Sequence, residues 1–336
     1  MPINRKIMGV SRGRVFTGAL SGSTTIASGT SPKGVCISAD GKSVYAVDNG
    51  NVRIFDRNTS TGALSGTSTI ETGSTPWDIC ISADGTSVYT ANSNSNTISI
   101  FSRNVSTGAL TSGGTIATGN RPYYICISAD GTSVYTANYV GATISIFSRN
   151  VSTGVLSGTS TIATASYPYG ICISADGTSV YAANFGGATA QIYTRSVSTG
   201  ALTSGGTIAT GTNPWEICIS ADGKSVYTAN QGNATISIFD RNISTGALSG
   251  TSTISTGTWP TGILVSPDGV SVYCTNQASA TVSIFARNVG TGALSGTSTI
   301  AAGDTPFGIC ISADGTNVYS TGSGSGSNKV HIFTRS

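Results

Sequence analysis

The sequence is poor in charged residues and in histidine. Charged residues make up 9% of the 336 residues and the net charge is +3, whereas an average soluble domain has about 25% charged residues. The chain therefore offers no strongly basic groove, and nucleic acid is not an expected partner. Its one histidine, His331, excludes zinc sites built from several histidines.

Long apolar runs are also missing. No run approaches the roughly 18 residues of a membrane span, and the first residues lack the apolar core of about 7–15 residues found in a signal peptide. We therefore expect no membrane partner. We expect a protein that is cytoplasmic or assembled from the cytoplasm, with export by another route left open. Residues 1–14 are expected to form a solvated N-terminal tail.

Internal repeats dominate what is present. The Asp-Gly pairs are spaced by 44 residues once and then by 46 residues five times. A period in the forties with many short β patterns is typical of propeller blades of four strands each. The pairs begin at Asp40, Asp84, Asp130, Asp176, Asp222, Asp268 and Asp314.

One repeat shows the four expected strands. After Pro122, the stretches "YYICIS", "TSVYTAN", "TISIFSR" and "VLSGTSTIAT" follow one another, separated by turn residues. The last repeat supplies three strands and stops at "KVHIFTRS", while "FTGALSGSTTIASG" (16–29) matches the fourth strand of the other repeats. The sequence thus predicts an all-β, seven-bladed propeller over residues 15–336. The N-terminal outer strand would join three C-terminal strands and close the ring.

The repeat also has a recognisable consensus. The stretch P-x-x-I-C-I-S-A-D-G-x-S-V-Y-T-A-N, followed by I-S-I-F-S-R-N-V-S-T-G-A-L, resembles the repeats of the YVTN and lactonase-type seven-bladed propellers. The resemblance covers residues 15–336 and implies the propeller fold. For function it implies sugar-lactone hydrolases, surface-layer proteins or binding proteins, because one fold serves many chemistries.

Most aspartates and arginines are expected to belong to the scaffold. Seven of the twelve Asp residues lie in the Asp-Gly turns, and seven of the twelve Arg residues share one position after the third strand. Both sets fall on the same rim. We expect the Asp side chains to bond their own turn amides and the Arg side chains to bridge neighbouring turns. A basic ring for phosphate or nucleic acid is the alternative.

The seven cysteines are expected to be free and buried. Six of them share one position on the innermost strand, and blades related by rotation hold them beyond disulfide range. In the sixth blade Leu264 takes that position, and a leucine can replace a buried thiol but not a metal ligand. No metal and no cofactor are therefore predicted.

The sequence offers few residues that could together form a catalytic site. Asp78 and Glu216 share the second position after the proline, in the second and fifth blades. Blades three apart face each other across the channel, so we expect these acids to be too far apart for direct acid–base cooperation. His331 stands where other third strands have Ser99 or Ser145, away from the axis, which argues against a Ser–His–Asp triad.

The resemblance adds a further consideration about catalysis. Lactonase relatives are thought to use basic and acidic side chains at the channel mouth. The mouth here would offer Lys33, Arg121, Asp78, Glu216 and Asp304. None of these matches a family position clearly, so no catalytic residue is predicted.

One face differs from blade to blade. The residues after the prolines and the loops between the second and third strands vary, whereas the opposite rim repeats almost letter for letter. Aromatic platforms with a few polar groups suit neutral ligands such as sugars. Packing of these rings as a plug in the channel is the alternative. The candidate ligand-binding residues are Trp77, Asp78, Arg121, Tyr123, Tyr124, Tyr139, Tyr169, Trp215, Glu216, Trp259 and Phe307.

These observations favour a non-enzymatic binding or recognition propeller that presents its variable aromatic face to a small polar ligand or a glycan. We expect a monomer. Two alternatives remain open. The first is a structural or assembly subunit with a protein partner, such as a surface-layer or virion component, and the second is a lactonase-like hydrolase of sugar lactones.

Overall fold

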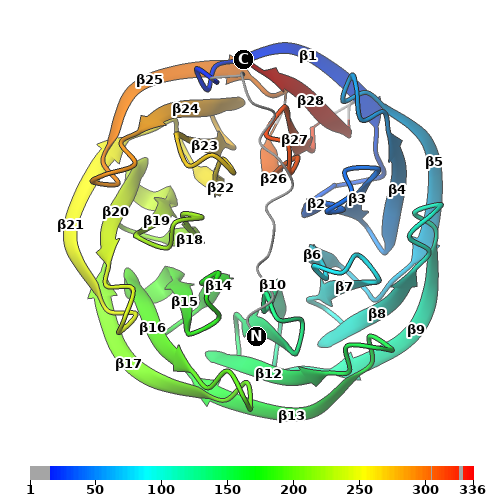
Figure 1. Ribbon diagram of the computed structural model, residues 1–336, viewed down its shortest axis with the longest axis horizontal. Helices are drawn as coiled ribbons and strands as arrows, with labels where there is room; N and C mark the ends of the chain where they lie inside the picture. Colours follow the sequence, from blue (N-terminus) through cyan, green and yellow to red (C-terminus); the bar gives the residue numbers. More distant parts are fainter. Residues whose placement is uncertain (1–15, 304, 325–327) are drawn as a thin grey trace, which may run out of the picture.

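The computed structural model describes residues 16–303, 305–324 and 328–336. The predicted tail at residues 1–14 and the candidate acid Asp304 lie outside these residues. In the described part of the chain, seven sheets of four antiparallel strands surround a central channel (Figure 1). The seven-bladed propeller expected from the repeats is confirmed. Within the same residues, no helix is long and apolar enough to cross a membrane.

Each blade begins at the channel and ends at the outer wall. The innermost strands are β2 (Val35–Ile37), β6 (Pro76–Ile81), β10 (Pro122–Ile127), β14 (Pro168–Ile173), β18 (Pro214–Ile219), β22 (Pro260–Val265) and β26 (Pro306–Ile311). The second strands are β3 (Ser43–Asp48), β7 (Ser87–Asn92), β11 (Ser133–Asn138), β15 (Ser179–Asn184), β19 (Ser225–Asn230), β23 (Ser271–Asn276) and β27 (Asn317–Gly322).

The outer half of each blade follows the same plan. The third strands are β4 (Asn51–Arg57), β8 (Thr97–Arg103), β12 (Thr143–Arg149), β16 (Thr189–Arg195), β20 (Thr235–Arg241), β24 (Thr281–Arg287) and β28 (Lys329–Arg335). The outer strands are β1 (Leu20–Ala27), β5 (Leu64–Glu71), β9 (Leu110–Ala117), β13 (Leu156–Ala163), β17 (Leu202–Ala209), β21 (Leu248–Ser255) and β25 (Leu294–Ala301). Two single-turn 3-10 helices, η1 (Phe185–Gly187) and η2 (Gln231–Asn233), follow second strands.

The ring closes as the sequence predicts. Strand β1 pairs antiparallel with β28, from Leu20 opposite Arg335 to Ala27 opposite Lys329. Figure 1 shows this first strand beside the last three strands of the chain. The seventh blade is therefore built from both ends of the chain, so no blade is left with an open sheet edge at the joint.

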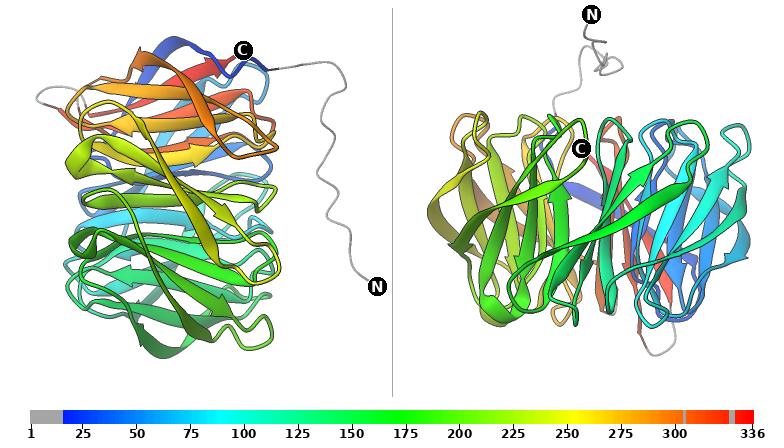
Figure 2. Two further views of the ribbon diagram at one scale, coloured as in Figure 1. Left: turned by 90° about the vertical axis from the view of Figure 1, so that its left-hand side faces the viewer. Right: turned by 90° about the horizontal axis from the view of Figure 1, so that it is seen from below.

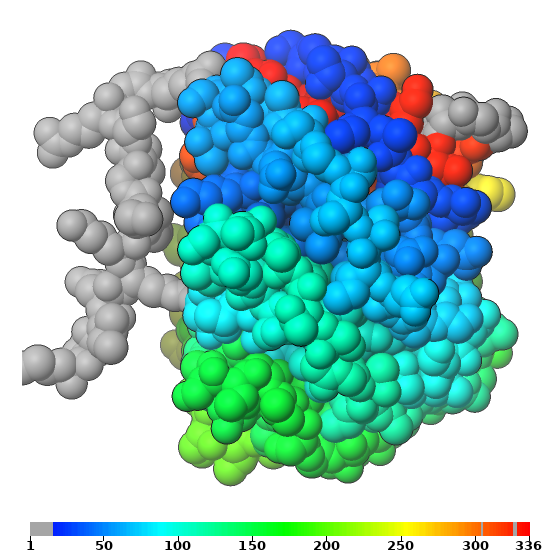
Figure 3. Space-filling model, turned by 90° about the vertical axis from the view of Figure 1, so that its right-hand side faces the viewer, coloured from blue at the N-terminus to red at the C-terminus, as the bar shows by residue number. Residues whose placement is uncertain are grey.

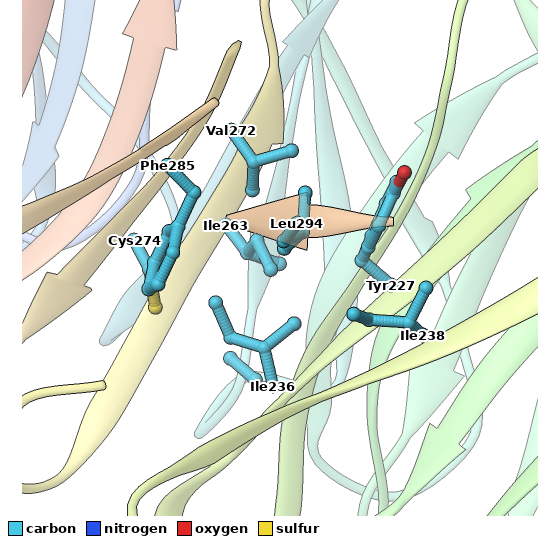
Figure 4. Packing of buried hydrophobic residues seen from close by; sticks show 9 residues of the cluster. Tyr227, Ile236, Ile238, Ile263, Val272, Cys274, Phe285 and Leu294 are labelled. Carbon is cyan, nitrogen blue, oxygen red and sulfur yellow. The ribbon is translucent and has the colours of Figure 1, made fainter. Parts of the chain in front are cut away.

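The core lies between blades rather than within one central layer. One cluster joins Tyr227 and Ile236 of the fifth blade to Ile263, Val272 and Phe285 of the sixth (Figure 4). Burying each such side chain stabilises the fold by about 1.5–3 kcal/mol. The outer strands are mostly exposed, as in β5, and form the side wall seen in Figures 2 and 3. Loops gather on the two rims of the disc (Figure 2).

A buried arginine fastens each blade to the one before it. Arg195, in the fourth blade, donates from Nε to the Tyr135 hydroxyl of the third blade at 2.7 Å and from Nη1 to the Gly177 carbonyl of its own blade at 3.0 Å. Its Nη2 lies 3.1 Å from Oδ2 of Asp130 in the third blade. The Tyr135 hydroxyl then donates back to the carbonyl of Gly200 in the fourth blade. We call this set of bonds the arginine clasp.

The clasp repeats at every junction between blades. The Arg–Asp distances range from 2.7 Å at Arg335 to 3.8 Å at Arg57. The predicted bridging role of these arginines is confirmed, and so is the bonding of each Asp to its own turn, as when Asp130 accepts from the Thr132 amide at 2.9 Å. Hydrogen bonds to its own turn and the nearby Arg195 hold the pKa of Asp130 at about 2 despite partial burial. The rim is consequently a structural ring rather than an anion site.

We predict that Arg195→Ala lowers the free energy of unfolding by roughly 2–3 kcal/mol, because it removes charged hydrogen bonds and leaves the buried Tyr135 hydroxyl without a donor. Urea unfolding monitored by tryptophan fluorescence measures this loss. The matched control is Asp130→Asn, which changes a partly exposed partner and should cost under about 1 kcal/mol. Equal losses for the two variants would contradict the clasp as described.

Candidate active site in the central channel

The residue that follows each blade's proline lies at one mouth of the channel. Five of these residues are aromatic and touch in a closed sequence, with centroids 4.4 Å apart for Trp77–Tyr123, 4.9 Å for Tyr123–Tyr169 and 4.2 Å for Tyr169–Trp215. Phe307 completes the circle, at 6.3 Å from Trp215 and 6.2 Å from Trp77. We call these five side chains the aromatic cap.

The aromatic cap is a packed layer rather than an open cup. Tyr123, Tyr169, Trp215 and Phe307 are 7–8% exposed. Ring–ring contacts of this kind stabilise by about 0.5–1.5 kcal/mol each beyond the area they bury. The packed arrangement is the one that the sequence analysis kept as its alternative.

The other aromatic candidates lie outside the circle. Tyr139 and Phe185, from the loops between second and third strands, stack onto the cap. Trp259 is 53% exposed and is not part of the cluster. Arg121 is exposed beside the Tyr123 hydroxyl. The proposed role of these residues in binding a ligand stays a prediction.

A second layer lies directly beneath the aromatic cap. The second residue after the proline is glycine in four of the seven blades, at Gly34, Gly170, Gly262 and Gly308. A Cβ at any of the four would come within 3.0 Å of a neighbouring backbone or side-chain atom, for example 2.7 Å from Asp78 at Gly34. The remaining three positions are Asp78, Tyr124 and Glu216. The glycines therefore leave room for three larger side chains in a narrow channel, a feature that was not predicted although the four glycines are visible in the repeats.

These side chains line a cavity of about 190 Å³ on the channel axis. Lys33, Trp77 and Phe307 form its upper wall, and the isoleucines of the inner strands form its lower wall. Below it, inner-strand side chains such as Cys126 and Ile127 remain partly exposed. The cavity is small compared with common ligand sites, which start near 300 Å³, and it suits a compact ligand.

Asp78 and Glu216 face this same cavity from different blades. Oδ2 of Asp78 accepts from the Ile125 amide at 3.1 Å, and Oε2 of Glu216 accepts from the Ile263 amide at 3.0 Å. Each carboxyl group is thus fixed by the inner strand of the next blade. Both line the same cavity, and Asp78 raises the pKa of Glu216 by its charge. The two acids, expected to be too far apart for direct acid–base cooperation, thus line one cavity and influence each other's protonation, because the glycines keep the channel narrow.

The pKa values of Asp78 and Glu216 are both raised, but to different extents. Both are partly accessible from the cavity but otherwise surrounded by protein, and desolvation raises the pKa of Asp78 to about 7. Desolvation and then the charge of Asp78 raise the pKa of Glu216 well above its ordinary value. Near neutral pH, Asp78 can therefore lose its proton while Glu216 keeps one. Paired groups whose pKa values are pushed apart are typical of acid–base sites.

One neutral donor, Tyr124, and one cation, Lys33, complete the cavity lining, and the Trp215 indole lies beside Tyr124. Burial raises the pKa of Tyr124 well above its usual range, so its hydroxyl keeps its proton. The Trp215 indole lies close enough to lower the Tyr124 pKa somewhat, yet its buried Nε1 has no partner with ordinary hydrogen-bond geometry among the described residues. Lys33 Nζ lies 3.5 Å from the Phe307 ring centroid and 5.1 Å from that of Trp77. Desolvation lowers the Lys33 pKa to about 8.

The cysteines do not form a metal site. All seven are free, as predicted. Cys274 is buried, whereas the six on inner strands are partly exposed, which differs from the expected full burial. Desolvation is the largest cause of the raised pKa of these thiols, as at Cys80 and Cys126, so they stay protonated and are poor ligands. Among the described residues, no group of three or more His, Cys, Asp or Glu could hold a metal ion.

The comparisons with known proteins place the chain in a family. The sequence model of the family described as "Lactonase, 7-bladed beta-propeller" matches residues 16–126, 115–216 and 205–313. The chain therefore belongs to the seven-bladed lactonase propeller family, as its repeats indicate. A comparison with curated proteins finds no match.

Several solved structures share the fold at low sequence identity. A putative 6-phosphogluconolactonase from Bacteroides fragilis has a TM-score of 0.74 at 24% identity, covering 82% of this chain and 86% of its own. The periplasmic gluconolactonase of Pseudomonas aeruginosa has a TM-score of 0.73 at 18% identity, covering 83% and 88%. A hydrazine synthase chain from Kuenenia stuttgartiensis has 0.73 at 18% identity, covering 93% and 97%. At these identities the likeness concerns the fold alone.

The family match corrects the functional prediction. The prediction of a non-enzymatic binding propeller is wrong, because the chain belongs to a family of lactonases. The aromatic side chains that suggested an exposed binding platform pack into a cap instead.

We predict that Asp78→Asn is more stable than the parent protein at pH 8 and close to it at pH 4. The folded pKa of about 7 exceeds the unfolded value of about 3.9. The parent is therefore stabilised below pH 4, and it loses this contribution as the pH rises through 7. The gain at pH 8 should be roughly 2–3 kcal/mol after allowance for solvent screening in the channel.

Thermal unfolding at the two pH values measures this difference. Asp240→Asn is the control, because Asp240 is an exposed acid on β20. A gain for Asp78→Asn that is the same at pH 4 and pH 8 would show that Asp78 is not a desolvated acid.

Proposed function

We propose that the protein hydrolyses a sugar-type lactone in the channel cavity. The observation that carries the proposal is the pair of desolvated carboxyl groups, Asp78 and Glu216, that face one cavity and hold their protons differently. Membership of the lactonase family supports it. Two structures of the same fold, from Bacteroides fragilis and Pseudomonas aeruginosa, bear the names of lactonases, and their names motivate the choice of substrate class.

Asp78 has the properties of the general base. With a pKa of about 7, its carboxylate can take a proton from water near neutral pH, and the water oxygen then bonds to the lactone carbonyl carbon. The hydrogen bond from the Ile125 amide holds the carboxylate in place. General-base catalysis of this kind contributes about 10²–10⁴-fold in rate.

Glu216 has the properties of the general acid. When the tetrahedral intermediate collapses, the bond between the carbonyl carbon and the ring oxygen breaks, and the ring oxygen needs a proton. Glu216 is protonated because burial and the charge of Asp78 raise its pKa, so it can supply that proton. The product is the open-chain hydroxy acid, and transfer of a proton from Asp78 to Glu216 through water restores both groups.

Lys33 is positioned to stabilise negative charge on the carbonyl oxygen. It lines the cavity and is held against Phe307 and Trp77. A positive charge or hydrogen-bond donor aimed at a developing oxyanion contributes about 2.7–4 kcal/mol to lowering the barrier.

We expect the protein to accelerate hydrolysis of D-glucono-1,5-lactone above its spontaneous rate, and Asp78→Asn to lower kcat by about 100-fold or more. A pH-stat assay corrected for the uncatalysed reaction measures both. Asp240→Asn, an exposed acid on β20, should keep the parent rate. Equal rates for the parent and Asp78→Asn would remove Asp78 from the mechanism.

The pH profile gives an independent test. We expect kcat/KM to rise as Asp78 loses its proton near pH 7 and to fall as Lys33 loses its proton near pH 8. In Lys33→Met the falling limb should vanish and the maximum rate should drop. A falling limb that persists in Lys33→Met would assign it to another group.

A further inference from the structure

Within the proposed function, we infer that the cavity takes an uncharged lactone and excludes phosphorylated ones. The inference rests on the charges that line the cavity. Asp78 and Glu216 contribute acidic groups, and Lys33 is the one cationic side chain among the lining residues that the structure describes. Its ammonium already lies against the faces of Phe307 and Trp77. A phosphate monoester carries about −1.5 to −2 charges at pH 7, which this lining does not balance.

The described arginines nearest in role to a phosphate site lie away from the cavity. The third-strand arginines form clasps on the opposite rim, where each guanidinium lies within 2.7–3.8 Å of an Asp carboxylate. Arg121 lies beside the Tyr123 hydroxyl and does not line the cavity. Phosphate recognition usually relies on bidentate arginines or a cluster of cations, and neither is found along the cavity lining.

Four backbone amides around the cavity are already hydrogen-bonded. The Gly34 amide donates to the Trp77 carbonyl at 3.0 Å and the Gly308 amide donates to the Lys33 carbonyl at 3.2 Å. The Ile125 and Ile263 amides donate to the two acids at 3.1 Å and 3.0 Å. Consecutive free amides are what a phosphate-binding nest requires, so these groups cannot substitute for missing cations.

The donors that remain are neutral. The Tyr124 hydroxyl lines the cavity and stays protonated. The Trp215 Nε1–H is buried without a partner of ordinary geometry, and it lies near that hydroxyl. Trp215 does not itself line the cavity, so its indole acts on a ligand only through the Tyr124 hydroxyl beside it. The cavity is thus complementary to an uncharged polyhydroxy ring.

A comparison of two substrates tests the inference. We expect kcat/KM for D-glucono-1,5-lactone to exceed that for its 6-phosphate ester by at least about 100-fold, because juxtaposed like charges cost several kcal/mol. Inorganic phosphate at about 10 mM, roughly one hundred times a typical KM of about 0.1 mM, should not inhibit. A preference for the phosphate ester would overturn the inference while leaving the proposed hydrolysis intact.

Binding of a non-hydrolysable probe separates the inference from catalysis. We expect the lactam analogue of the unphosphorylated substrate to change tryptophan fluorescence, through Trp77 and Trp215 in the cap, and the 6-phosphorylated lactam to bind at least about 100-fold more weakly. If neither lactone is hydrolysed but the neutral lactam binds, the proposed function fails and the charge selection stands. Tighter binding of the phosphorylated lactam, or binding of neither, overturns the inference.

Two variants place the selection in the cavity. Phe307→Arg adds a cation to the lining, and its matched control Phe307→Leu opens the same space without charge. We expect the preference for the neutral substrate to be at least about tenfold smaller in Phe307→Arg than in Phe307→Leu. Equal preferences in the two variants would count against selection by charge.

Tyr124→Phe tests the neutral donor. It keeps the ring but removes the hydroxyl that lines the cavity, so we expect KM for the neutral lactone to rise by about 5–10-fold. An unchanged KM would show that the hydroxyl takes no part in binding the lactone.

Discussion

The propeller depends on one interaction, the arginine clasp between neighbouring blades. A four-stranded blade cannot bury both of its faces alone, so its stability comes from the blade beside it. The clasp sets that contact at the rim: the guanidinium of Arg195 ties a Tyr hydroxyl and an Asp carboxylate of one blade to a turn carbonyl of the next. An equivalent Arg–Asp pair at each junction, Arg335 and Arg57 included, joins the blades into a closed ring.

This constraint explains why one rim is uniform and the other is not. The clasp needs Asp, Tyr, Arg and Gly at fixed positions. The sequence of the rim that carries the Asp-Gly turns can therefore vary little. At the opposite mouth, the residue after each proline needs only a side chain of suitable size to help fill the channel. Five blades contribute rings to the aromatic cap, and Lys33 lies against two of those rings. The variation that first indicated a ligand face is therefore also the variation expected where seven side chains of differing size must together fill a channel.

The aromatic cap and the four glycines beneath it together determine the surroundings of the two acids in the channel. Four glycines narrow the channel at the level where Asp78, Tyr124 and Glu216 project. In this narrow channel, the charge of Asp78 affects the pKa of Glu216 although the two acids come from distant blades. The aromatic cap covers them and limits their contact with water. Desolvation then raises both carboxyl pKa values, while the clasp carboxylates at the wetter rim, such as Asp130, move in the opposite direction. Aspartate therefore serves the structure on one rim and has a raised pKa near the other.

The sequence by itself determined the number of blades, the strands of each blade and the closure of the ring, because those features follow from periodicity and from matching stretches at the two ends. It also determined the clasp partners, since seven Asp and seven Arg recur at equivalent positions. The sequence contained Asp78 and Glu216 but not the distance between them, which depends on how seven inner strands converge on an axis. Only the tertiary structure decided that the aromatic residues pack into a cap and that the two acids share a cavity, because both outcomes depend on packing across the ring rather than along the chain.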